Sequence, residues 1–256
     1  MRLDASPGRP LALLGVVILL ALFAAGGCSY MSEVKAKDHE FTADALRAGK
    51  VVVVSVVQVD ELADVRPPYI DALERVLHAT RRDLTLVPQS RATAALDNTT
   101  ARFLLLGYQM HGTPEPRWLE RAAAALRPLA RYGILARVDD TAVRHADRVD
   151  PTSDPGQRSE TGMVRVTGQD VHVSIQVYDL ETATVAFSGA YWGSNEVALS
   201  EGEAMPPRES ETDETDVSTP YDSTVAGLYL KTPQLVRSLE TAFVEFARSL
   251  PGGPAR

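Results

Sequence analysis

The 256-residue chain has a single cysteine, Cys28, and few aromatic residues, which make up 6% of the sequence. One cysteine cannot form a disulfide within the chain, and a lone cysteine in an exported protein needs another explanation. The low aromatic content does not favour a groove that stacks sugars or bases. No two of the five histidines stand three or four residues apart, so the sequence offers no helical metal-binding pair.

Several catalytic and nucleotide-binding motifs are also absent from the sequence. It has no P-loop, no Gly-x-Gly-x-x-Gly fingerprint and no Gly-x-Ser-x-Gly nucleophile elbow. Its formal charge of −8 argues against nonspecific nucleic-acid binding, which requires a basic face. We therefore expect a protein that is not an enzyme, binds no metal and has no nucleic-acid partner.

Residues 1–27 have the parts of a secretory signal peptide. Two early arginines precede an unbroken apolar run at residues 11–25, and two small residues, Gly26 and Gly27, stand before Cys28. The run is shorter than the roughly 20 apolar residues that a membrane-spanning helix needs. The alternative interpretation is an uncleaved N-terminal anchor in which the cysteine is incidental.

The segment Ala25-Gly26-Gly27-Cys28 resembles the bacterial lipobox, in which an aliphatic residue and two small residues precede a cysteine. The resemblance implies cleavage before Cys28, a thioether-linked diacylglycerol on its sulfur and an acyl chain such as palmitate on its new amine. No other cofactor is expected. Several acyl chains together hold a protein stably to a bilayer. Ser29 follows the cysteine, which in enterobacterial-type sorting implies the periplasmic face of the outer membrane.

The remaining chain divides into three parts. Residues 28–40 are polar and charged and are interpreted as a lipidated tether, residues 41–250 as a single α/β domain, and residues 251–256 as a disordered tail. Within the domain, residues 196–222 hold nine acidic residues, three prolines and one arginine. This composition predicts a mobile acidic insertion.

The predicted fold is a mixed β-sheet flanked by helices, with a C-terminal hairpin and helix. The run KVVVVSVVQV at residues 50–59 is typical of a strand buried on both faces. Strands are expected at 50–59, 84–87, 102–110 and 131–144 and in a hairpin over 164–192, and helices at 67–80, 90–96, 118–131 and 232–250. A loop is expected at 145–160.

The order of these elements resembles an α/β domain shared by several envelope lipoproteins. They include the LpoB-type activators of penicillin-binding proteins, the curli-secretion lipoprotein CsgG and the N-terminal domain of TolB. The resemblance rests on residues 50–80, 102–143 and 171–192, the last reading VHVSIQVYDLETATVAFSGAYW. Ala183 stands where such hairpins have a turn glycine. The resemblance implies a non-catalytic, membrane-anchored scaffold of the cell envelope that binds another envelope protein.

One group of carboxylates follows the predicted central strand. Asp60, Glu61 and Asp64 come after its C-terminal end, where α/β sheets often place their sites. They could bind a cation or a basic partner, and a solvated turn is the alternative interpretation.

Two rival functions remain open. In a periplasmic hydrolase with an unrecognised carboxylate site, Asp139, Asp140 and Glu181 would converge in one pocket. In a pore-forming secretion subunit of the CsgG type, the chain would need two long amphipathic hairpins, and the acidic segment 196–222 is poorly suited to form one.

Overall fold

The run of β-branched residues forms the interior strand β2 (Lys50–Gln58) of the computed structural model, which describes residues 32–59, 67–149, 163–199 and 234–253. Strand β2 pairs in parallel with β3 (Thr85–Val87) on one side and with β4 (Tyr132–Val149) on the other. Both of its faces are buried, because Val51 joins the core on one side of the sheet and Val52 joins a separate cluster on the other.

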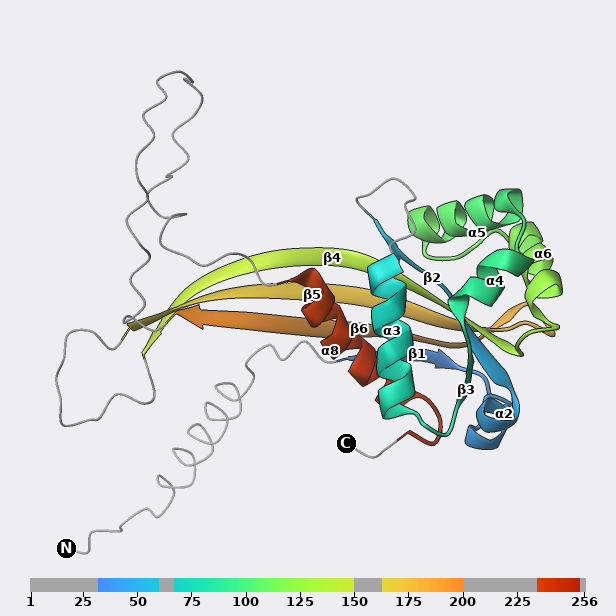
Figure 1. Cartoon of the computed structure of the whole chain (residues 1–256), viewed down its shortest axis with the longest axis horizontal. Helices are drawn as coiled ribbons and strands as arrows, with labels where there is room; N and C mark the ends of the chain where they lie inside the picture. The colour runs from blue at the N-terminus through green and yellow to red at the C-terminus, as the bar shows by residue number, and fades with distance from the viewer. Residues whose placement is uncertain (1–31, 60–66, 150–162, 200–233, 254–256) are drawn as a thin grey trace, which may run out of the picture. The chain divides into compact units, whose positions relative to one another are not determined.

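The sheet has six strands in the order β1-β6-β5-β4-β2-β3. Strands β5 (Met163–Asp179) and β6 (Thr184–Leu199) form the expected hairpin, which extends the sheet from β4 by antiparallel pairing. Helices lie on both faces (Figure 1), so the predicted α/β class and mixed sheet are confirmed. The described residues, from Ser32 onward, belong to one compact unit.

Each face of the sheet carries its own set of helices. The larger core lies under α2 (Ala43–Ala48), α3 (Pro67–Thr80) and α8 (Leu235–Ser249). The opposite face bears α4 (Gln89–Ala95), α5 (Asn98–His111) and α6 (Pro116–Leu126). Figure 1 shows α3 and α8 side by side on their face of the sheet, where they contact each other.

No described helix is both long enough and apolar enough to cross a membrane.

The prediction of a strand at 102–110 is wrong, because these residues lie within helix α5. Asp97 caps the helix, its Oδ1 accepting a hydrogen bond from the Thr100 amide at 2.9 Å, and Gly112 ends it with a left-handed φ of +71°. Leu104, Leu105 and Tyr108 are buried at a spacing that fits one face of a helix. An apolar run of this length is compatible with a strand or a helix, and the caps decide between them.

The predicted tether at 28–40 is too long. Residues Glu33–Lys37 form strand β1, which pairs antiparallel with β6 and makes the outer edge of the sheet. The predicted tail at 251–256 also begins too early, because Pro251 is buried and its carbonyl accepts a hydrogen bond from the Arg81 guanidinium at 2.9 Å. The remaining residues of both segments, 28–31 and 254–256, lie outside the described part of the chain.

Two further boundaries differ from the prediction. Strand β4 runs on to Val149, into the expected loop at 145–160, and β6 includes residues 196–199 of the expected acidic insertion. Pairing with β5 along the full length of β4 accounts for the first extension, since 17 register pairs join the two strands. The rest of both predictions, 150–160 and 200–222, falls on residues that the structure does not describe.

Candidate functional site

Most residues singled out in the sequence fall outside the described ranges. These are the lipobox residues Ala25, Gly26, Gly27 and Cys28 and the carboxylates Asp60, Glu61 and Asp64. Their predicted roles stay predictions.

Asp139 is the centre of a polar cluster on the sheet face that bears α4, α5 and α6. The β4–β5 register shifts between Val138 and Asp140, which places a bulge at Asp139. The pairing of β4 with β2 ends at Val138, one residue before the bulge. The Asp139 carboxylate accepts hydrogen bonds from Arg137 Nε at 2.6 Å and Ser174 Oγ at 2.5 Å. His172 Nδ1 lies 3.3 Å from the same carboxylate.

His172 is held between this carboxylate and an aromatic ring. Its ring centroid lies 4.3 Å from that of Trp192, with an interplanar angle of 32°. Burial lowers the pKa of His172, and this effect outweighs the attraction of the nearby Asp139 carboxylate. Burial therefore favours the neutral imidazole of His172.

The Asp139 cluster lacks the geometry of a hydrolytic triad. A nucleophilic serine must donate its hydroxyl proton to a base, usually a histidine, while the carboxylate orients that base. Ser174 instead donates directly to Asp139, and His172 contacts the same carboxylate. Among the described residues, no group of three His, Cys, Asp or Glu side chains is arranged to hold a metal ion.

The carboxylates of the hydrolase hypothesis do not converge. The Asp139 cluster lies beside His172 on β5, whereas Glu181 lies in the turn beyond Asp179 at the end of that strand. Seven residues of extended strand separate His172 from Asp179, which is roughly 23 Å. Glu181 lies instead 4.0 Å from Arg131 Nε. The convergence that this rival required is therefore contradicted.

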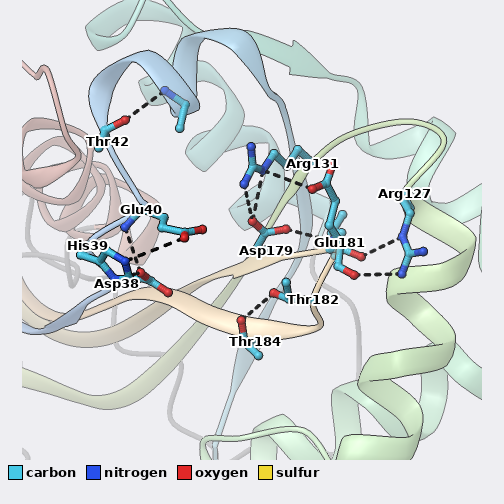
Figure 2. A network of polar contacts seen from close by, with 12 residues as sticks. Asp38, His39, Glu40, Thr42, Arg127, Arg131, Asp179, Glu181, Thr182 and Thr184 are labelled. Atoms are coloured by element: carbon cyan, nitrogen blue, oxygen red, sulfur yellow. Dashed lines mark hydrogen bonds and ion pairs between the residues drawn. The ribbon is translucent and has the colours of Figure 1, made fainter.

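Figure 2 shows a second polar network, in which Arg131 lies between Asp179 and Glu181 at the β5–β6 turn. Arg131 Nε and Nη2 both donate to Asp179 Oδ2, at 3.1 and 3.0 Å. Arg127 donates to the Leu180 and Glu181 carbonyls, each at 3.2 Å. The hydrogen bond to Asp179 raises the pKa of Arg131. These contacts bind the turn to β4 and to the segment after α6, and they leave the arginines serving structural roles.

Two cavities lie away from these networks. A groove of about 580 Å³ runs between α3 and the segment from Leu86 to Pro88, and charged side chains of both signs line it, including Glu74, Arg75 and His78. Glu74 accepts a hydrogen bond from the Gln89 amide at 2.8 Å, and burial raises the pKa of Glu74. A smaller cavity of about 210 Å³ between α4 and α5 has mostly apolar walls.

Comparisons with known proteins find no sequence relative. No family model matches the chain, and no curated protein matches it.

Among solved structures, several are similar to parts of the chain. PelC from Paraburkholderia phytofirmans, a dodecamer, is 16% identical, with a TM-score of 0.32 over 65% of this chain and 82% of its own. The LpoB C-terminal domain from Salmonella enterica is 12% identical, with a TM-score of 0.27 over 60% and 83% of the two chains. Lipoprotein GNA1162 from Neisseria meningitidis is 10% identical, with a TM-score of 0.29 over 57% and 83%. Similarities this low assign neither a family nor a function.

Proposed function

We propose that the protein is a lipid-anchored envelope lipoprotein whose periplasmic domain is a non-catalytic module that binds another envelope protein. The observation that carries the proposal is the position of Cys28, the one cysteine of the chain, directly after an apolar run and two glycines. Lipidation explains both the presence of this cysteine and its place. The expected site of attachment is the periplasmic face of the outer membrane.

The polar side chains of the domain support the non-catalytic part of the proposal. Asp139 binds Arg137 and Ser174, and Asp179 binds Arg131, so the groups best suited to acid–base chemistry are engaged in holding strands and turns. The groove beside α3 offers shape and mixed charge for a partner protein.

Replacing Cys28 with serine tests the anchor. The wild-type chain should be processed, should fractionate with membranes and should incorporate a clickable palmitate analogue. Cys28→Ser should remain unprocessed and take up no label, whereas the control Ser29→Ala keeps the cysteine and should behave as wild type. A Cys28→Ser protein that still reaches its processed size in the membrane fraction would exclude lipidation at this site.

Photo-crosslinking in intact cells tests the binding part. A photoreactive amino acid at His78, in the groove, should give a discrete crosslinked species containing another envelope protein. The same probe at Glu120, which is exposed on α6, is the control and should not give that species. If neither position captures an envelope protein, the binding-module proposal fails while the anchor proposal stands.

A further inference from the structure

Helix α5 exposes a line of large apolar side chains. Phe103, Leu106 and Met110 are 41%, 36% and 66% exposed, and their spacing of three and four residues puts them on one side of the helix, opposite its buried face. We call these three residues the α5 stripe. The other large exposed apolar residues among those described are single valines dispersed over strands and loops. Isolated exposed apolar residues are ordinary, whereas a contiguous line marks a contact surface.

Arginines border the α5 stripe. Phe103 stacks on Trp118 with centroids 4.8 Å apart and an interplanar angle of 11°. The guanidinium groups of Arg117 and Arg121 lie 5.0 and 4.9 Å from the Trp118 ring centroid, and Arg117 also pairs with Glu115 at 2.9 Å. Residues 89–127, which include α4, α5 and α6, carry five arginines and three acidic residues, although the whole chain has a formal charge of −8. Residues 89–127 therefore carry a formal net charge of +2, opposite in sign to that of the whole chain.

Only a short segment of chain separates Cys28 from the first described strand. Cys28, the proposed lipidation site, is five residues before Glu33, the first residue of β1, and a chain of this length spans at most about 17 Å. Glu33 pairs with Ala190, which pairs with Ser174 on β5, so β1 and β5 are about 10 Å apart in the sheet. Two residues along β5, the Gln176 side chain donates to the Gly112 carbonyl at the end of α5 at 3.0 Å. The anchor can therefore bring the end of α5 near the bilayer.

We propose that the α5 stripe, with its bordering arginines, docks on the anionic phospholipid surface of the membrane that holds the protein. Apolar side chains would enter the interface, and arginines would bind lipid phosphates. A second copy of the chain is the alternative occupant, and the experiment below distinguishes it from a membrane. The inference rests on the proposed lipid anchor only for the choice of membrane as the partner.

Vesicle flotation of the non-lipidated chain, residues 29–256, tests the proposal. This protein retains every described element, since the compact unit begins at Ser32. It should bind phosphatidylcholine vesicles that contain phosphatidylglycerol, and bind vesicles of phosphatidylcholine alone more weakly. Leu106→Glu and Met110→Glu should each weaken binding about tenfold. Val143→Glu is the matched control, because Val143 is 47% exposed on β4, away from α5, and it should bind as wild type.

Arg102 is exposed on α5 next to Phe103, and an Arg102→Glu variant tests the electrostatic contribution to binding. It should reduce the preference for anionic vesicles and the sensitivity of binding to salt. Absence of vesicle binding by the wild-type chain, or equal binding by Leu106→Glu, would overturn the proposal. A dimer in solution that Leu106→Glu dissociates would also overturn it, by assigning the stripe to self-association. None of these outcomes depends on lipidation at Cys28, so failure here leaves the Cys28→Ser result to stand alone.

Discussion

At Ala183 the hairpin turn uses a backbone conformation that suits glycine. Its φ of +54° lies in the left-handed region, and it is the one non-glycine residue with positive φ among those described. An alanine in this conformation lowers the free energy of unfolding by roughly 1 kcal/mol. Glycine removes this strain, but it makes the unfolded chain more flexible, and that flexibility offsets part of the gain. Ala183→Gly should therefore stabilise the protein by about 0.5 kcal/mol and raise its Tm slightly in thermal unfolding.

The control variant is expected to change the free energy of unfolding in the opposite direction. Ala94 is exposed in helix α4, and Ala94→Gly should lower the free energy of unfolding by about 1 kcal/mol. If both variants destabilise equally, Ala183 is not strained. The resemblance to envelope lipoproteins identified Ala183 as the position where their hairpins carry glycine. The sequence could not predict the partners of Asp139. The alternation in β5 places His172 and Ser174 on one face, but it does not give their register against β4.

At the scale of elements, the contact of α8 with β6 depends on a glycine. A Cβ added to Gly193 would lie 1.9 Å from the Ser238 carbonyl oxygen, so the helix backbone would have to move. Gly193→Ala should therefore destabilise the protein by roughly 2–3 kcal/mol in urea unfolding. At Gly168, on β5, the nearest atoms belong to the flexible Arg144 side chain at 3.3 Å. Gly168→Ala should be nearly neutral, and an equal loss in both variants would contradict this account of α8 packing.

The elements that the sequence predicted well are those with a strong period or a clear boundary. The proline pair that begins α3, the alternating pattern of β5 and the apolar face of α8 predicted the class of each element and nearly its bounds. Strand β1 could not be predicted in the same way, because all five of its residues are exposed and its stability comes from pairing with β6. A short, polar edge strand has little hydrophobic pattern of its own. Helix α5 was missed because its apolar stripe lies on the side opposite its buried face, so the run appears apolar all round.

At the scale of the whole molecule, Arg81 connects parts of the chain that are far apart in sequence. Its side chain is 1% exposed, and its guanidinium donates to Asp83 at 2.9 and 3.0 Å and to the Pro251 carbonyl at 2.9 Å. Asp83 also accepts a hydrogen bond from Arg47 of α2 at 3.3 Å. A buried arginine needs such partners, since an unpaired buried charge is strongly destabilising. The residue thereby fixes the C-terminal segment to α2 and to the end of α3.

The contact between Arg81 and Asp83 predicts that part of the protein's stability is lost in acid. The hydrogen bond from Arg81 lowers the pKa of Asp83 from 3.8 to about 2. A carboxyl whose pKa is depressed by folding stabilises the folded state fully above its unfolded value, and the contribution disappears as the pH falls from about 4 through about 2. Asp83→Asn should cost about 1 kcal/mol near neutral pH, a few degrees in Tm. Asp44→Asn, at a residue 94% exposed beside Arg47, is the control and should parallel the wild type.

Melting curves from pH 7 to pH 2 should therefore show the wild type and Asp83→Asn converging as the carboxyl protonates. A constant Tm difference across this range would mean that the charge of Asp83 does not stabilise its contact with Arg81.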